Sequence, residues 1–107
     1  MTSYAVAHLR DVVMSPALIE YVQAIDGTLA PFEGHFIIHG GEKIVLEGHV
    51  ADDLIVIAFP DRQSALGWYD SPAYRAILDK RKGSSKGEVF IIDGVEDGHR
   101  AIDILHP

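Results

Sequence analysis

Residues 54–78 read LIVIAFPDRQSALGWYDSPAYRAIL and join a wholly apolar segment to a helical region that is interrupted in its middle. Leu54–Phe59 is apolar at every position, which is typical of a strand covered on both faces. The helical region that follows contains Ser71 and Pro72, which together form the capping signal that begins a new helix. We therefore predict a strand followed by a broken helix with its joint at Asp70.

The rest of the chain supplies another helix and the other strands. A Ser-Pro pair at 15–16 begins that helix, because the serine hydroxyl caps free backbone amides and proline fits the first helical position. Four residues at helical spacing form a stripe that we expect to face the core: Leu18, Val22, Ile25 and Leu29. The strands are expected at Tyr4–Arg10, at His35–Gly48 with a bend at Gly40 and Gly41, and at Val89–Ile92, and a loop is expected at Arg81–Lys86.

This order of elements predicts an α+β fold, the ferredoxin-like βαββαβ unit with an antiparallel sheet. We expect residues 1–95 to form one such domain and residues 96–107 to be a C-terminal tail. Both crossovers of this unit have the same hand, so both helices lie on one face of the sheet. The other face would expose more apolar surface than a soluble monomer usually does. A second copy of the chain is the simplest cover, which predicts a homodimer.

The composition argues against several classes of partner. Nine Lys and Arg face sixteen Asp and Glu, so the net charge is −7 and we expect no nucleic-acid partner. The absence of Cys excludes disulfides and thiolate chemistry, and it suits a reducing, cytoplasmic location. No segment reaches the roughly 18 apolar residues that a membrane span needs, and no export signal is visible, so we expect no membrane partner.

The histidines predict a loss of solubility in mild acid. Six His would each gain a proton between about pH 8 and about pH 5, and six added charges would bring −7 to −1. A chain near zero net charge associates more readily, so we expect lower solubility near pH 5 than near pH 8. Precipitation assays across this range check the prediction, and equal solubility at both ends would contradict it.

Two stretches carry a resemblance to a known family. They are residues 21–41, YVQAIDGTLAPFEGHFIIHGG, and residues 59–95, FPDRQSALGWYDSPAYRAILDKRKGSSKGEVFIIDGV. Both resemble the uncharacterised family called domain of unknown function 1330, most specifically at Trp68–Pro72 with Tyr74. The resemblance implies a dimeric α/β barrel, in which two sheets close together. It implies no reaction, and the small monooxygenases, lactone isomerases and haem-degrading enzymes of that superfamily bear on this chain only by analogy of fold.

The candidate catalytic residues lie near the break in the second helix. Trp68, Tyr69 and Tyr74 flank the break, where aromatic rings either wall a pocket against the sheet or only fill the core. Asp70 is expected either to cap the following helix or to orient Tyr69 or His39 as a general base. On the functional interpretation His39, Tyr69 and Asp70 are catalytic, and Trp68 and Tyr74 bind the ligand.

Basic residues supply further candidates for ligand binding. Arg62, near the start of the second helical region, would complement an anion, although a solvated surface is the simpler interpretation. The same two interpretations apply to Arg81 and its neighbouring lysines. His8 and Arg10 share one face of the first strand and become functional candidates if that face looks into a barrel.

No cofactor or metal site is expected. His35 and His39 are separated by four residues of strand, about 13 Å, which is too far for one ion. No Gly-rich phosphate loop or nucleophile elbow is present, so nucleotide hydrolysis and ordinary serine hydrolysis are disfavoured.

Two functions remain open. The first is a small-molecule enzyme or binder with its pocket between the broken helix and the sheet, where oxidation, isomerisation or proton transfer proceeds without a cofactor. The second is a non-catalytic homodimer that binds a metabolite or a protein. A closed apolar pocket with at least two convergent polar groups favours the first function, and a solidly packed interface between helices and sheet favours the second.

Overall fold

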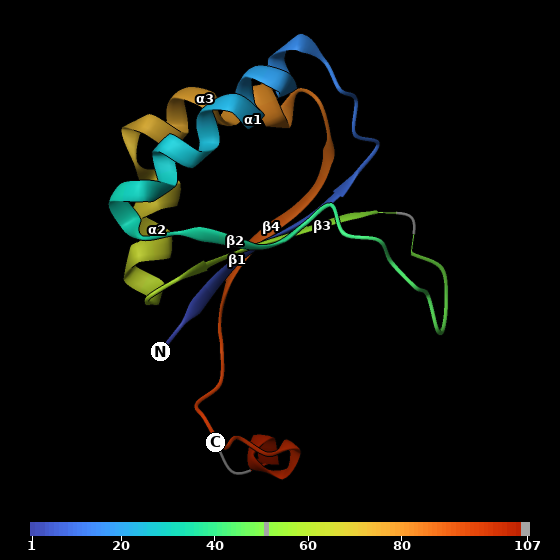
Figure 1. Cartoon of the computed structure of the whole chain (residues 1–107), viewed down its shortest axis with the longest axis vertical. Helices are drawn as coiled ribbons and strands as arrows, with labels where there is room; N and C mark the ends of the chain where they lie inside the picture. Colours follow the sequence, from blue (N-terminus) through green and yellow to red (C-terminus); the bar gives the residue numbers. More distant parts are fainter. Residues whose placement is uncertain (51, 106–107) are drawn as a thin grey trace.

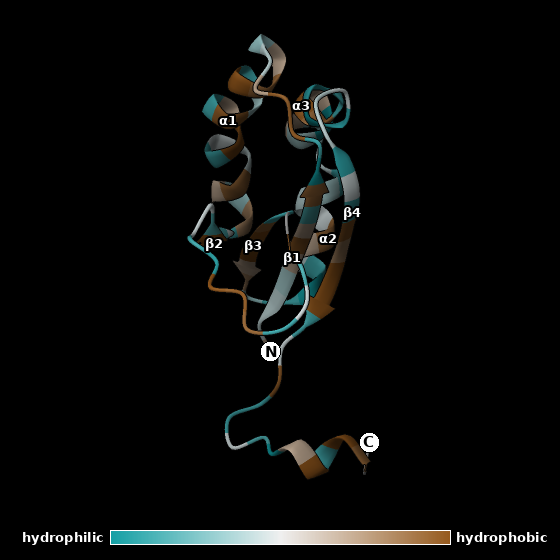
Figure 2. Cartoon of the chain, turned by 90° about the vertical axis from the view of Figure 1, so that its right-hand side faces the viewer, coloured by the Kyte–Doolittle hydropathy of each residue, from teal (hydrophilic) through white to brown (hydrophobic). Residues whose placement is uncertain are grey.

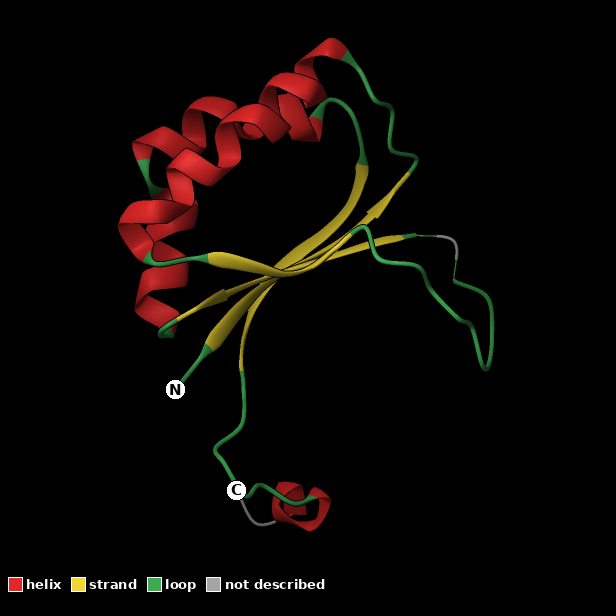
Figure 3. Cartoon of the chain, viewed as in Figure 1, coloured by secondary structure: helices red, strands yellow, loops and turns green. Residues whose placement is uncertain are grey.

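The chain folds as an α+β ferredoxin-like unit in a computed structural model that describes residues 1–50 and 52–105 (Figures 1 and 3). Its four strands form one antiparallel sheet in the order β2-β3-β1-β4. In chain order the elements are β1 (Ser3–Arg10), α1 (Pro16–Leu29), η1 (Ala30–Phe32), β2 (His35–His39), β3 (Asp53–Phe59), α2 (Arg62–Asp70), α3 (Pro72–Lys82), β4 (Lys86–Asp93) and η2 (Ala101–Leu105). The predicted fold class is confirmed.

Serine and aspartate caps begin the helices. The Ser15 hydroxyl accepts a hydrogen bond from the Leu18 amide at 3.1 Å, and the Asp61 carboxylate accepts one from the Ser64 amide at 2.7 Å. Ser71 has an extended backbone and caps α3 in the same way, so the predicted break between α2 and α3 is confirmed. The interpretation of Asp70 as the cap is wrong, because Asp70 is the last residue of α2.

Three predicted boundaries are wrong, and one of them is the start of the last strand, which begins at Lys86 and not at Val89. The strand expected over residues 35–48 ends at His39, because Gly40 turns the backbone to a φ of +72° and residues 41–50 pair with no strand. The loop expected from Arg81 begins later, because α3 continues to Lys82. Arg81 therefore belongs to a helix, where its side chain is buried.

All three α-helices cover one face of the sheet, as predicted (Figure 1). Ala5 of β1 pairs in register with Ile57 of β3, and both side chains are buried under the helices. The stripe predicted on α1 differs at one position: Leu18, Ile25 and Leu29 are buried as predicted, whereas Val22 is 46% exposed and Tyr21 is buried instead.

The other face of the sheet carries no helix. It is the face of Val6, which lies in register between Val56 of β3 and Phe90 of β4. Four large apolar side chains on this face are 39–52% exposed: Ile38, Leu54, Phe90 and Ile92. Figure 2 shows the second half of β4 as hydrophobic and its first half as hydrophilic. We call this surface the open face.

Two segments extend away from the sheet and its helices. The loop after β2 carries Ile44 and Leu46, which are 83% and 91% exposed, and the tail carries Ile104, which is 76% exposed in η2. Figures 1 and 2 show the tail leaving the end of β4 and running away from the sheet. None of the helices in residues 1–50 and 52–105 has the length and apolar character that crossing a bilayer requires.

Candidate functional site

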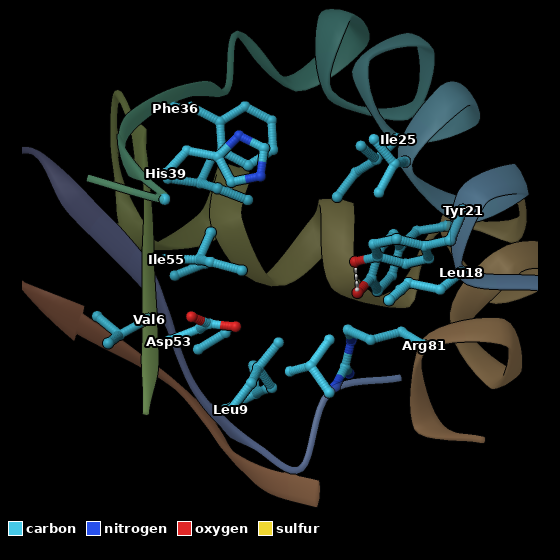
Figure 4. Close-up of a pocket in the computed structure, with 18 of the residues that line it drawn as sticks. Val6, Leu9, Leu18, Tyr21, Ile25, Phe36, His39, Asp53, Ile55 and Arg81 are labelled. Atoms are coloured by element: carbon cyan, nitrogen blue, oxygen red, sulfur yellow. Dashed lines mark hydrogen bonds between the residues drawn. The ribbon is translucent and has the colours of Figure 1, made fainter. Parts of the chain in front are cut away.

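A cavity of about 270 Å³ lies between the helices and the covered face of the sheet (Figure 4). Its walls are mostly apolar side chains from β1, β3 and α1, with Trp68 and Tyr74 contributed by the broken helix. The lining residues are Ala5, Val6, Ala7, Leu9, Val12, Met14, Leu18, Tyr21, Val22, Ile25, Phe36, His39, Gly40, Asp53, Ile55, Ile57, Trp68, Tyr74, Arg81 and Val89. The cavity is thus bounded by α1 as well as by the broken helix, where the prediction named the broken helix alone.

Two buried tyrosines form the first polar group of the cavity. The hydroxyls of Tyr21 on α1 and Tyr74 on α3 are 2.7 Å apart and share one hydrogen bond. Burial, followed by the neighbouring Tyr74, raises the pKa of Tyr21 far above its ordinary range, although Arg81 acts in the opposite direction. Tyr21 is therefore a neutral phenol at physiological pH, able to donate or accept a hydrogen bond.

Arg81 brings a positive charge to the same corner. Its side chain is only 8% exposed, and Figure 4 shows it extending from α3 into the same side of the cavity as Tyr21. Burial by itself lowers the pKa of this guanidinium, but the neighbouring Tyr74 and Tyr21 outweigh burial and raise it. Arg81 is thus a cation at the wall of an apolar cavity.

His39 and Asp53 form a second polar group on the opposite side. Figure 4 shows both side chains coming from the sheet, across the cavity from Tyr21 and Arg81. The imidazole of His39 stacks on Phe36, with ring centroids 4.5 Å apart and the planes 16° from parallel. A molecule in the cavity therefore meets an imidazole and a carboxylate on one side, and two phenols and a guanidinium on the other.

Trp68 forms part of the cavity wall. Its ring centroid lies 4.1 Å from that of Tyr74 and 5.5 Å from that of Phe59. Its Nε1 donates a 3.0 Å hydrogen bond to Oγ1 of Thr28, whose hydroxyl in turn donates to the Ile25 carbonyl at 2.7 Å. These contacts hold the indole, and through it Tyr74, in one orientation.

Three predicted site residues on or beside the broken helix lie outside the cavity lining. Asp70 forms a 2.7 Å ion pair with Arg75, and the Arg75 guanidinium also lies 4.8 Å from the ring centroid of Tyr69. Arg62 forms a hydrogen-bonded ion pair with Asp93 at the start of α2. The predicted roles of Tyr69, Asp70 and Arg62 in the site stay predictions.

His8 and Arg10 lie on the open face, on the other side of the sheet from the cavity. His8 is 3.1 Å from a carboxylate oxygen of Asp52, and Arg10 is 2.7 Å from one of Glu88. Hydrogen bonding and attraction from Arg10 hold the pKa of Glu88 below its usual value. These residues form a charged cluster at one end of the open face, and their predicted role in ligand binding stays a prediction.

Two polar residues of the cavity, Tyr21 and Asp53, were absent from the predicted site, and Arg81 had been considered only with the basic residues beside it as a possible anion site. Tyr21 lies three residues after Leu18 and four before Ile25, so it belongs to the same helical stripe. Arg81 lies seven residues after Tyr74, which returns it to the same face of α3. Asp53 alternates with Ile55 and Ile57, which places it on the covered face of β3. Periodicity thus relates each of the three to other residues of its face, whereas the packing of the elements decides that this face borders the cavity.

Removing one phenol of the tyrosine pair is expected to destabilise the fold modestly. Tyr21→Phe leaves the buried Tyr74 hydroxyl without its partner, and we expect the free energy of unfolding to fall by about 1–2 kcal/mol. The double variant Tyr21→Phe/Tyr74→Phe should lose less than the sum of the two single variants, since no orphaned hydroxyl remains. Urea denaturation of all four proteins measures this coupling, and strictly additive losses would contradict it.

Within the residues that the structure describes, no cluster of three or more His, Asp or Glu side chains is arranged to hold a metal ion. His35 and His39 are both exposed, and of the two His39 lines the cavity. The sheet order places β3 between the strand of these two histidines and the strand of His8.

The fold matches solved structures at low sequence identity. The RPA0582 protein of unknown function from Rhodopseudomonas palustris gives a TM-score of 0.67 at 15% identity, covering 92% of this chain and 84% of that chain. A variant of SnoaB, a cofactor-independent oxygenase from Streptomyces nogalater, gives a TM-score of 0.59 at 15% identity. The match covers 92% of this chain and 98% of the SnoaB chain. A dimeric ferredoxin-like protein of unknown function from Jannaschia sp. CCS1 gives 0.62 at 12% identity, covering 90% and 100%.

These likenesses establish the fold and no activity, because the identities are 12–15%. No curated protein matches the sequence. The family model of a domain of unknown function, DUF1330, matches residues 2–95, which include every strand and α-helix of the structure. The chain belongs to the DUF1330 family.

Proposed function

We propose that the chain binds a small, mostly apolar molecule in the cavity and transfers a proton at a carbonyl or phenolic group of that molecule without a cofactor. The observation that carries this proposal is the pairing of an apolar cavity with polar groups on two opposite sides. Few polar groups converging in an apolar pocket are the usual form of a small-molecule site. A solidly packed interface would have favoured a purely structural role for the helices.

His39 is the best-placed residue to move the proton. Imidazole is the side chain most often used as a general base, and His39 lines the cavity opposite Tyr21 and Arg81. Negative charge that develops on a substrate oxygen would be stabilised by the buried phenols and the guanidinium, whose positions are already held by packing. That SnoaB is described as a cofactor-independent oxygenase supports the proposal only in showing that a similar fold accommodates such chemistry.

The proton transfer is tested by hydrogen exchange at carbon. A small aryl ketone such as acetophenone, incubated with the protein in D₂O, should exchange its α-protons faster than in buffer. His39→Gln should lower the catalysed rate on the order of a hundredfold, which is the usual contribution of a general base. His35→Gln is the matched control, because His35 lies on the same strand and is exposed outside the cavity.

Binding without exchange would favour the second function. If small ketones, phenols or quinones raise the melting temperature but no exchange above buffer occurs, the chain is a non-catalytic binding protein. Haem serves as a control for size, since it is too large for a cavity of about 270 Å³. Tyr69→Phe tests the prediction that Tyr69, which lies outside the cavity lining, takes part in the site.

The open face supports a homodimer as the assembled form. Its apolar centre, around Val6, Val56 and Phe90, is bordered at one end by the charged cluster of His8 and Arg10 with their carboxylates. An apolar centre with a polar rim is the usual anatomy of an interface between proteins. The protein of similar fold from Jannaschia sp. CCS1 is described as dimeric, which supports a dimer for this chain.

A further inference from the structure

We propose that the molecule bound in the cavity carries an anionic oxygen, a carboxylate or a phenolate on a single small ring system, and that this oxygen binds to Arg81 between the hydroxyls of Tyr21 and Tyr74. This inference rests on the proposed function, namely that the cavity binds a small molecule. It adds the charge and size of the ligand and the position of its polar end.

The charge follows from the partners of the arginines. Arg10, Arg62 and Arg75 are partly exposed, and each is paired with a carboxylate. Arg81 is 8% exposed, yet in residues 1–50 and 52–105 no carboxylate lies within ion-pair distance of it. A buried cation without a counter-ion is strongly unfavourable unless an opposite charge or hydrogen bonds compensate it. The neighbouring phenols favour the charged form of Arg81 but carry no full negative charge, so an anion in the cavity would supply the counter-ion that Arg81 lacks.

The position follows from the contacts of Arg81. Its side chain lines the same cavity as Tyr21 and Tyr74, on the side of Tyr21 (Figure 4), and both tyrosines are near enough to affect the pKa of Arg81. The two phenols share a single hydrogen bond, so one hydroxyl hydrogen stays available for a ligand. A guanidinium fork beside a phenol donor is suited to a planar oxyanion, because both supply N–H or O–H donors to the same small region.

The size and shape follow from the cavity. An apolar cavity of about 150 Å³ accommodates benzene, so the cavity of about 270 Å³ has room for one substituted ring. The body of the ligand would lie against Leu18, Ile25, Ile55 and Trp68, which are apolar or aromatic. The acidic Asp53 on the opposite side disfavours a second anionic group, so we infer a monoanion.

The test compares matched probes on the full-length protein by calorimetry. Benzoate represents the carboxylate, 4-nitrophenol represents the phenolate, and benzamide is the neutral ligand of the same shape as benzoate. We expect the wild-type protein to bind benzoate at least tenfold more tightly than benzamide. For 4-nitrophenol, the absorbance of its ionised form should increase on binding at constant pH, which shows that the phenolate is the bound species.

Variants of one helix locate the anion. Arg81→Met keeps an unbranched, apolar side chain and removes the charge, and it should weaken benzoate binding at least tenfold while benzamide binding stays within about threefold. Arg75→Met is the matched control on α3, outside the cavity, and should bind benzoate as the wild type does. If Arg81→Met fails to fold, Arg81→Lys and Tyr21→Phe replace it, and each should weaken the binding of benzoate more than the binding of benzamide.

The outcomes separate this inference from the proposed function. Equal affinity of the wild type for benzoate and benzamide, or unchanged benzoate binding in Arg81→Met, would overturn the proposal that an anion binds to Arg81. The cavity would then be a site for neutral molecules. No binding of any ring-sized probe would overturn the proposed function itself. An increase in the absorbance of ionised 4-nitrophenol without any benzoate binding would identify phenolates as the ligands. Benzoate binding without such an increase would identify carboxylates.

Discussion

Trp68→Ala is expected to lower the free energy of unfolding by about 3–5 kcal/mol, the usual range for removal of a large buried aromatic side chain. Trp68 is 2% exposed and packs between Phe59 and Tyr74. The substitution also leaves the Thr28 hydroxyl without its indole donor. Because small domains are stable by only about 5–15 kcal/mol, the variant should unfold at a much lower urea concentration.

Two further variants identify the cause of this loss. Leu66→Ala on the same helix removes a side chain that is 46% exposed, so we expect a loss below about 1 kcal/mol. Trp68→Phe keeps most of the packing and removes the hydrogen bond to Thr28. Its loss in the free energy of unfolding should lie between those of Leu66→Ala and Trp68→Ala. Urea denaturation at one fixed protein concentration measures all three, since association changes apparent stability. A Trp68→Ala loss no larger than that of Leu66→Ala would mean that the indole does not support the cavity wall.

Phe90→Glu is expected to convert the proposed dimer into a monomer. Phe90 is 47% exposed at the middle of the open face, in register with Val6. In a face-to-face dimer its replacement would bury a carboxylate among apolar side chains of both copies, which is among the most unfavourable changes an interface can undergo. We expect the dissociation constant to rise at least a hundredfold, so that sedimentation equilibrium at micromolar concentration shows a single chain.

The matched control introduces the same charge on the helical side. Ile19 on α1 is 43% exposed, close to the value for Phe90, but it lies away from the open face. Ile19→Glu should therefore remain a dimer. A wild-type protein that is already monomeric at micromolar concentration, or a Phe90→Glu variant that stays dimeric, would contradict the prediction that the open face is the dimer interface.

The functional proposals depend on side chains that are distant in the sequence. Tyr21 and Tyr74 are brought together by the packing of α1 on α3, and Arg81 joins them from the end of α3. His39 reaches the same cavity from an edge strand of the sheet. The binding experiments and the stability experiments are therefore coupled, because a change that loosens the packing of the helices also displaces Tyr21, Tyr74 and Arg81.

The candidate site was predicted only in part. Trp68, Tyr74 and His39 line the cavity, whereas Tyr69 and Asp70 lie outside its lining although they sit beside the same helix break. Adjacent residues on a helix point about 100° apart, so closeness to the break does not place a side chain on the buried face. The exact helical phase decides this, and it is set by contacts with the sheet and with α1.

The amino-acid sequence determined the features that depend on near neighbours. Serine caps before proline set the starts of α1 and α3, the continuous apolar run at 54–59 produced β3, and the order of elements led to the ferredoxin-like unit. Each of these follows from hydrogen bonds or periodicity within a few residues, which a sequence displays directly.

Only the tertiary structure decided which face of each element is buried. A one-residue change of register moves every side chain of a strand to the other face, and on α1 Tyr21 is buried where Val22 was predicted to be. The burial of Arg81 and the opening of a cavity beside it depend on how α1, α3 and the sheet fit together. These contacts join residues far apart in the chain, and their geometry exists only once the elements have packed.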